Sequence, residues 1–496
     1  MDPTEDLRGY LARLADLDEV RTVDKPVDPD LELGAITRHC YETGAPAPLF
    51  TQLTRGNPGF RVLGAPAGPS RRHGHELARA AVSLGLPSSA RGQDIVAALA
   101  DARTREVVPP RTVDGGPCKD NIVLGEDVDL DVFPIPLLHE GDGGRYFNTW
   151  GTLIVADPEG RWTNWTIARV MVHDKRTLVG LIVPSQHIGQ IFAQWRERGE
   201  PMPFAIAQGG HPAIPFACAM PIPRDVDEAA YVGAYLGAPL EVVRCETNGL
   251  HVPANAEIVV EGHVDLVSKA PEGPMGEYTG YLAKEPSSGS LMHVDAVTYR
   301  NQAILPIVAA GEPVDETHVG TGIGAAAEGL HQLRAAGIPV TTCWVPFESA
   351  LTWLVVTVPG SWHEDFDGTS TELTTAIATN VFHSKVGSAP LVVVVTYDDI
   401  DPTDLKALVW AMASRTHPHD GVIFFPDETV SPLPPVWTAA ERRGMRAAKV
   451  AYNALFGDEY VTRADLPRRS SFAHCYPAEL QEQVLRQWRS YGLDIG

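Results

Sequence analysis

Hydrophobic side chains recur at helical spacing at the start of the chain. From Glu5 to about Asp16 they stand at i, i+3, i+4 and i+7, which predicts an amphipathic helix. These positions are Leu7, Tyr10, Leu11 and Leu14. The same reasoning predicts helices at about 31–43 (stopped by Gly44), 75–84 and 93–105. Residues 1–110 are therefore expected to form an N-terminal α/β domain.

The pattern changes after residue 110 to short runs rich in β-branched residues. Residues 151–156 read Gly-Thr-Leu-Ile-Val-Ala and residues 256–261 read Ala-Glu-Ile-Val-Val-Glu, with Gly and Pro turns between such runs. This pattern predicts a barrel-like β domain over residues 111–306.

Strands and helices alternate again beyond residue 306. The aliphatic run from Leu391 to Thr396 predicts a buried strand, and apolar residues at helical spacing follow it. Asp401 and Pro402 are expected to cap and begin that helix. Its apolar face consists of Leu405, Leu408, Val409 and Met412. The pattern predicts a C-terminal α/β domain over residues 307–456 and a tail over residues 457–496.

Composition narrows the class of protein. The 496 residues are 44% hydrophobic and 21% charged, which is typical of a globular chain. The net charge of −23, without any basic run, argues against binding to nucleic acid or to an anionic membrane. Neither a secretory signal nor a membrane-spanning run is present, so a cytoplasmic protein is expected. Six cysteines without a CxxC pair are expected to be reduced thiols.

Two glutamates dominate the candidate chemistry. Glu272 and Glu277 flank a segment with two glycines and a proline, so no regular helix is expected between them. Two such carboxylates can have different roles, since one can stay ionised while the other is protonated and donates its proton. Taken alone, the loop fits a surface turn with solvated glutamates better. Arg169 changes this balance, because it ends an apolar run and can bind a carboxylate bidentately.

These motifs, in this order, resemble the UbiD family of decarboxylases, which use prenylated FMN with an Arg-Glu-Glu catalytic set. The resemblance extends from residues 30–37 to residues 491–494. It implies that Arg169, Glu272 and Glu277 are catalytic. It also implies that the central domain is a split β-barrel that binds the flavin, that the C-terminal domain is an oligomerisation domain, and that the tail contacts a neighbouring subunit.

The resemblance further implies metal ions and cofactor contacts. A Mn²⁺ or Mg²⁺ ion would be held by Asn164, His187 and Glu228, whose amide, imidazole and carboxylate suit such a metal. A potassium ion would be held by Trp162, Ala217, Met220 and Glu228. The flavin would touch Asn164, Thr166, Ile167, Ala168, Arg169, Gln186, His187, Cys218, Ala219, Met220, Glu228 and Lys385. Cys218 and Ala219 stand where some members carry hydroxyl residues.

A glycine-rich segment at residues 320–325 does not match a dinucleotide-binding loop, because its spacing differs and no suitably placed acidic residue follows. It is expected to be the entry to a helix around residues 325–335. His318, just before it, is expected to be a packed loop histidine, with a place facing the substrate cavity as the alternative.

The predicted function is reversible, non-oxidative decarboxylation of an unsaturated or aromatic carboxylic acid with prenylated FMN. Arg169 would orient the substrate carboxylate, Glu272 would hold Arg169, and Glu277 would protonate the carbon. A flavin prenyltransferase would supply the cofactor, and the chain would form a homodimer or a multiple of it. Two alternatives stay open: a catalytically silent flavin-binding subunit, and a paired-glutamate hydrolase. Pocket residues are expected near Gln186, Ile323 and Ala389.

Overall fold

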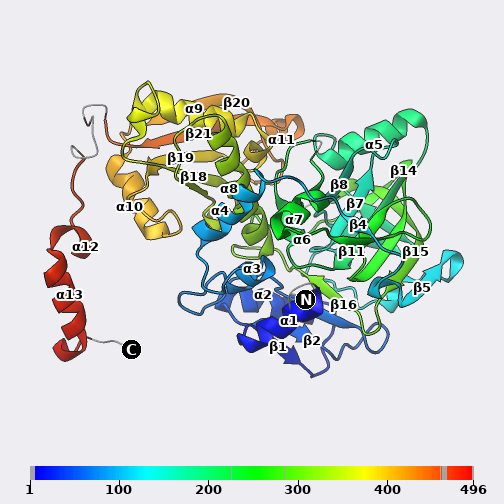
Figure 1. Ribbon diagram of the computed structural model, residues 1–496. Coiled ribbons are helices and arrows are strands. Elements are labelled where there is room, and N and C mark those ends of the chain that lie inside the picture. The colour runs from blue at the N-terminus through cyan, green and yellow to red at the C-terminus, as the bar shows by residue number, and fades with distance from the viewer. Residues whose placement is uncertain (1–5, 225, 284, 458–459, 461–465, 494–496) are drawn as a thin grey trace.

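The chain folds as a mixed α/β protein, seen in a computed structural model that describes residues 6–224, 226–283, 285–457, 460 and 466–493. Figure 1 shows three neighbouring units and a C-terminal tail that lies apart from them. The first predicted helix begins at Leu7, with Asp6 as its N-cap, and Glu5 lies outside the described residues. All four of its predicted apolar positions are buried, which confirms the helical spacing.

The N-terminal unit is a small sheet with helices. Its elements are α1 (Leu7–Asp16), β1 (Val20–Val23), α2 (Glu32–Thr43), β2 (Ala47–Phe50), β3 (Arg61–Gly64), α3 (Ala78–Ser83) and α4 (Gly92–Ala102). Helix α2 ends at Gly44, whose left-handed φ of 60° lets the chain turn without a Cβ clash. The sheet order is β1-β2-β3-β16, where β16 (Ile304–Ile307) comes from far along the chain and pairs parallel to β3.

The central unit is built on a curled nine-stranded sheet. Its strands are β5 (Asn121–Leu124), β6 (Tyr146–Asn148), β7 (Thr152–Ala156), β8 (Thr163–Thr166), β9 (Val170–Asp174), β10 (Thr177–Gly180), β11 (Met202–Gly209), β14 (Ala256–Glu272) and β15 (Ser287–Tyr299). Their order is β6-β9-β10-β15-β14-β11-β7-β8, with β5 on β15.

Helices and a second, small sheet complete the central unit. They are α5 (His187–Arg198), α6 (Ile214–Ala219), α7 (Glu228–Leu236), β4 (Arg111–Thr112), β12 (Glu241–Arg244) and β13 (His251–Pro253). Short 3₁₀ turns are η1 (Pro117–Lys119), η2 (Gly125–Asp127) and η3 (Leu130–Val132). The curled sheet encloses a buried apolar cluster that includes Leu153, Phe204 and Met292.

The C-terminal unit is a five-stranded sheet with the order β17-β18-β19-β21-β20. Its elements are α8 (Glu316–Ala335), β17 (Thr342–Trp344), η4 (Phe347–Ser349), β18 (Trp353–Val358), η5 (Trp362–Glu364), α9 (Ser370–Phe382), η6 (Lys385–Ser388), β19 (Val392–Tyr397), α10 (Leu405–Arg415), β20 (Val422–Thr429), α11 (Ala439–Gly444) and β21 (Arg446–Ala454). The expected strand is β19, and its central valines are fully buried.

The start of the following helix was predicted wrongly. Helix α10 begins at Leu405, and its N-cap is Asp404, whose carboxylate accepts from the amides of Lys406 and Ala407. Asp401 instead accepts from the amide and the hydroxyl of Thr403 and closes the preceding turn. Two aspartates competed for the cap, and the one adjacent to the first helical turn reaches its free amides.

The glycine-rich segment also differs from its prediction, because it lies within α8 and not at its entry. A Cβ at Gly320 would lie 3.1 Å from the Trp150 ring, and one at Gly324 would lie 2.8 Å from the Cγ of Met220. Glycine is therefore needed here for close packing of α8 on the central unit. His318 lies in the first turn of this helix and is fully buried.

The tail carries α12 (Phe472–Cys475), α13 (Ala478–Gln487) and η7 (Trp488–Tyr491), drawn in red in Figure 1. Leu485 and Trp488 are 64% and 43% exposed. Before these helices, the Arg469 guanidinium lies 5.1 Å from the Trp410 ring centroid on α10. Among the described residues, no helix is long and apolar enough to cross a membrane. The cysteines are free thiols, of which Cys475 is exposed.

A buried carboxyl group joins α8 to the N-terminal unit. Glu316 is fully buried, accepts from the Ala67 amide at 2.9 Å, and is hydrogen-bonded to the Tyr41 hydroxyl. Burial raises the pKa of Glu316 to about 7. In the unfolded chain a glutamate has its ordinary pKa near 4.5. Between about pH 4.5 and pH 7, the Glu316 carboxyl group is therefore protonated in the folded protein and ionised in the unfolded chain.

We predict that this proton makes stability depend on pH. The bound proton contributes to the free energy of unfolding in full below about pH 4.5. This contribution is lost as the pH rises to about 7, at roughly 1.4 kcal/mol per pH unit in that window. The substitution Glu316→Gln removes the titrating group. The melting temperature of the native protein should therefore fall relative to that of Glu316→Gln between pH 5 and pH 8. A constant difference between the two proteins across this range would contradict the prediction.

Candidate functional site

Glu272 and Glu277 lie at the end of a long strand and in the connection that follows it. Glu272 is the last residue of β14, and the chain then leaves the sheet without forming a helix, as predicted. The turn is closed by hydrogen bonds from the Glu277 amide to the Tyr281 carbonyl and from the Gly280 amide to the Glu277 carbonyl. The second glutamate is therefore on a closed turn and not on a free loop.

Arg169 bridges the two glutamates. Its Nε donates to Glu272 Oε1 and its Nη2 to Glu272 Oε2, each at 2.9 Å, and its Nη1 contacts the Glu277 carboxylate. The Glu272 side chain is fully buried, whereas the side chains of Arg169 and Glu277 are 20% and 14% exposed. The structure thus brings the three predicted catalytic residues together.

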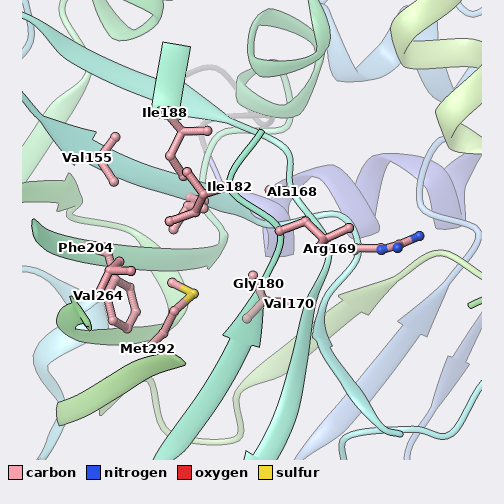
Figure 2. A pocket seen from close by; sticks show the side chains of 12 residues that line it. Val155, Ala168, Arg169, Val170, Gly180, Ile182, Ile188, Phe204, Val264 and Met292 are labelled. Atoms are coloured by element: carbon pink, nitrogen blue, oxygen red, sulfur yellow. The ribbon is translucent and has the colours of Figure 1, made fainter. Parts of the chain in front are cut away.

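A narrow apolar cavity of about 10 Å³ lies behind Arg169 within the curled sheet. Figure 2 shows the Arg169 side chain pointing away from the apolar side chains that line the cavity. The lining residues are Leu153, Val155, Ala168, Arg169, Val170, Gly180, Leu181, Ile182, Ile188, Phe204, Val264 and Met292. Of the predicted site residues, only Ala168 and Arg169 are among them. Gln186, Ile323 and Ala389, expected near the pocket, do not line this cavity.

A second polar cluster holds two of the predicted divalent-metal ligands, Asn164 and Glu228, in direct contact, and Lys385 links it to the third, His187. Asn164 on β8 donates through Nδ2 to Glu228 Oε1 at 2.9 Å, and the Trp165 amide donates to Glu228 Oε2 at 2.9 Å. His187 begins α5, and the Lys385 ammonium lies 3.2 Å from its Nδ1 and 3.3 Å from its Nε2. Lys385 also donates to the Ile222 carbonyl at 3.0 Å.

Burial controls the protonation of this cluster. It lowers the pKa of His187 to about 4, with help from the positive charges of Lys385 and Arg224, so the imidazole is neutral at pH 7. Burial also raises the pKa of Glu228 and lowers that of Lys385, and the attraction between these two groups opposes both shifts. A bound cation beside Glu228 would favour its ionised form.

The donor set fits a divalent cation. A neutral imidazole and a carboxylate are available ligands, and the Asn164 Oδ1 is buried without a hydrogen-bond partner in the part of the chain that the structure describes. For the potassium set, the Trp162 and Ala217 carbonyls each accept one backbone hydrogen bond, from Asp157 and Met220. Each carbonyl keeps a second lone pair for a cation.

The other predicted cofactor residues come from four places around this cluster. Thr166 ends β8, Ile167 and Ala168 link it to Arg169, and Gln186 is the N-cap of α5. Cys218 and Ala219 lie on α6, and Met220 caps it. The Cys218 thiol lies 3.7 Å from the Thr152 hydroxyl, and burial raises the pKa of this thiol well above its usual range. It is therefore a neutral, packed group.

Three residues support the site from distant segments, and of these only His318 was considered from the sequence. Tyr146 donates its hydroxyl to Glu272 Oε1 at 3.0 Å, and Asn148 donates to the Ala168 carbonyl at 2.7 Å, next to Arg169. His318 on α8 donates through Nε2 to the Tyr278 carbonyl at 2.7 Å. These contacts join segments that are distant in sequence, and spacing along the chain does not reveal them.

Comparison with curated proteins shows two groups of similar decarboxylases. The chain is 41% identical over 483 residues to the pyrrole-2-carboxylic acid decarboxylase of Pseudomonas aeruginosa, covering 97% of both chains. It is 35% identical to ferulic acid decarboxylase 1 of Saccharomyces cerevisiae, covering 99% of both chains.

Solved structures share the fold. The UbiD-class enzyme HmfF of Pelotomaculum thermopropionicum, in an evolved dimeric form in complex with prFMN, matches with a TM-score of 0.77 and 27% identity over 94% of this chain and 97% of that one. The vanillic acid decarboxylase of Sedimentibacter hydroxybenzoicus in its closed form matches with a TM-score of 0.83 and 22% identity, over 98% and 99% of the two chains. At that identity the second match concerns the fold alone.

Family models match along most of the chain. The models of the 3-octaprenyl-4-hydroxybenzoate carboxy-lyase match in its N-terminal domain at residues 11–99, in its Rift-related domain at residues 111–313 and in its C-terminal domain at residues 318–454. These three matches follow the order of the three units of the fold. The chain belongs to the UbiD family.

Proposed function

We propose that this protein catalyses the reversible, non-oxidative decarboxylation of an α,β-unsaturated, aromatic or heteroaromatic carboxylic acid. One observation carries the proposal: a guanidinium held by a buried carboxylate lies between that carboxylate and a second, partly exposed one. The similarity to pyrrole-2-carboxylic and ferulic acid decarboxylases over nearly the whole chain supports it.

Arg169 binds the substrate carboxylate in this proposal. Two of its nitrogens are engaged by Glu272, so Nη1, now beside Glu277, is the position that a substrate carboxylate can take. Entry of that anion would displace the Glu277 carboxylate from its cation. A carboxyl group beside a second anion and without its cation is driven toward the protonated form. Substrate binding thereby prepares Glu277 to donate a proton.

Glu272 has a separate role. It is fully buried and holds Arg169 through two hydrogen bonds, so it orients the guanidinium and does not reach the substrate. After CO₂ leaves, Glu277 delivers its proton to the carbon that carried the carboxylate.

The proposal includes prenylated FMN as the cofactor, in agreement with the prFMN-bound UbiD-class structure. When bound, this flavin supplies the electron sink for the charge left by departing CO₂. Asn164, His187 and Glu228 would hold a Mn²⁺ or Mg²⁺ ion, and Trp162, Ala217, Met220 and Glu228 would hold a potassium ion. Lys385 would pair with the phosphate of the flavin as a point charge. A flavin prenyltransferase would provide the cofactor.

A paired-glutamate hydrolase and a catalytically silent flavin-binding subunit account for fewer of the contacts of Arg169, Glu272 and Glu277. A paired-glutamate hydrolase needs a sugar between its carboxylates, whereas here an arginine joins them. A silent flavin-binding subunit would need neither the buried Arg169–Glu272 pair nor Glu277. Release of CO₂ by the flavin-loaded protein distinguishes an enzyme from such a subunit.

We predict that Glu277→Gln abolishes proton delivery with little change in structure. The amide keeps the volume of the side chain but has no acidic proton, so kcat should fall by about a hundred- to ten-thousand-fold. The assay is CO₂ release by protein produced with a flavin prenyltransferase. Arg169→Ala is the comparison and should instead raise KM, since it removes the carboxylate ligand. If Glu277→Gln kept activity within about threefold of the parent, with solvent deuterium still incorporated, Glu277 would not be the acid.

A second prediction concerns the ion cluster. Glu228→Gln removes the one negative charge among the proposed metal ligands while preserving the hydrogen bond from Asn164. The purified variant should contain less bound Mn²⁺ and less flavin than the native protein, measured by elemental analysis and by absorbance. The control is Glu241→Gln, which alters an exposed ion pair with Arg111. Equal metal and flavin content in all three proteins would argue against this site.

A third prediction concerns assembly as a homodimer or a multiple of it. The exposed apolar residues of α13 and η7 support a contact with a second copy through the tail. Light scattering at micromolar concentration should give at least the mass of a dimer. Leu485→Lys should weaken the assembly, whereas Gln483→Lys on the same helix is the matched control. A monomeric native protein would refute the prediction.

A further inference from the structure

Residues 139–146 run antiparallel to the segment that carries the two glutamates. Three contacts connect them: the Tyr146 hydroxyl donates to Glu272, the Gly143 amide donates to the Pro274 carbonyl at 2.7 Å, and the Gly276 amide donates to Asp142 Oδ1 at 2.9 Å. Moving backwards from residue 146 to residue 142, the partners move forwards from residue 272 to residue 276, as in an antiparallel pair. We name residues 139–146 the brace segment, because they support the segment that carries the two glutamates.

The brace is closely packed. A Cβ on Gly143 would lie 1.9 Å from the Gly273 carbonyl oxygen, and one on Gly276 would lie 2.7 Å from the His139 ring. The Asp142 side chain is fully buried, and its second oxygen accepts from the His139 amide at 3.0 Å. Asp142 Oδ2 therefore accepts from His139 within the brace segment, and Asp142 Oδ1 accepts from Gly276, the residue directly before Glu277.

Tyr146 is hydrogen-bonded to Glu272. Its side chain is fully buried, and its hydroxyl reaches the same oxygen of Glu272 that accepts from Arg169 Nε. Burial and the charge of Glu272 raise the pKa of the Tyr146 hydroxyl well above its usual range, so it stays a donor at any working pH. The charged groups around this contact are Arg169, Glu277 and Asp142.

We propose that Tyr146 and Asp142 are positioning residues for the decarboxylase reaction: Tyr146 keeps Glu272 directed at Arg169, and Asp142 holds the peptide that presents Glu277. The inference rests on the proposed function and assigns it two further residues. Neither side chain is placed against the substrate. The two act on different glutamates, so their loss has different signatures.

Loss of the Tyr146 hydroxyl takes away one of the donors to the buried Glu272 carboxylate. Glu272 then no longer holds Arg169 in one direction, so Tyr146→Phe should raise KM by about tenfold and leave kcat within about threefold of the native value. Asp142→Asn keeps the side-chain volume but replaces one acceptor oxygen by a donor. It should lower kcat by about tenfold or more and leave KM within about threefold, because it misplaces Glu277 and leaves the Arg169–Glu272 pair in place.

The matched control is Tyr10→Phe. Tyr10 is also buried, and its hydroxyl donates to the carbonyls of Pro66 and Arg79 in the N-terminal unit. This variant should keep the native KM and kcat. The same rise of KM in Tyr10→Phe as in Tyr146→Phe would mean a general loss of stability and would overturn the proposal.

The experiment combines kinetics with hydrogen–deuterium exchange of peptides covering residues 272–281, on protein loaded with its flavin. The proposal expects faster exchange in Asp142→Asn and a raised KM in Tyr146→Phe. Native kcat and KM in both variants would overturn it. If Asp142→Asn does not fold, the KM of Tyr146→Phe decides alone. If the native protein decarboxylates none of the acids tried, the proposed function fails, and unchanged exchange in both variants would then also overturn the brace.

Discussion

The buried ion pair between Arg169 and Glu272 is the interaction on which the site depends. It joins residues 103 positions apart, one following β8 and one ending β14, and it leaves a single guanidinium edge for other anions. A buried charge without a partner is very costly, so each of the two residues requires the other. The pair therefore fixes the direction in which Arg169 points, and with it the place where a substrate carboxylate can bind.

Charge compensation also organises the second cluster. Glu228 and Lys385 are both buried, and their mutual attraction opposes the effect of burial on each. The neutral His187 lies beside Lys385, and Asn164 lies beside Glu228, with an Oδ1 atom that has no hydrogen-bond partner among the residues that the structure describes. Because an unpaired buried polar oxygen is unfavourable, this arrangement is suited to hold a cation. Lys385 comes from the C-terminal unit, so the cluster also links two units of the fold.

Helix α8 connects all three units. Its glycines allow it to pack against Trp150 and Met220 of the central unit, and Glu316 in its first turn bonds to the N-terminal unit. His318 reaches the turn that carries Glu277. The position of Glu277, the proposed proton donor, thus depends on the packing of a helix from another part of the chain. The close approach of Gly320 to Trp150 and of Gly324 to Met220 is the physical reason why a glycine-rich segment lies within this helix.

The sequence by itself determined the broad order of helices and strands, the non-helical segment between Glu272 and Glu277, and the residues that belong together in the site. Spacing predicts α1 because four buried positions repeat with the period of a helix, and composition argued against a basic binding surface. Motif resemblance indicated Arg169 and the proposed metal donors, which no periodicity relates to one another.

Only the tertiary structure decided which side chains and strands contact one another. In the structure, Asp404 and not Asp401 is the N-cap of α10, the glycine-rich segment lies inside α8, and β16 pairs with the N-terminal sheet. It also showed Tyr146 and Asp142 against the glutamate segment. Local patterns record the environment along a single helix or strand, whereas a hydrogen bond between distant segments depends on how strands are ordered and paired. The sequence therefore indicated the chemistry of the site, and the packing of the sheet decided its geometry.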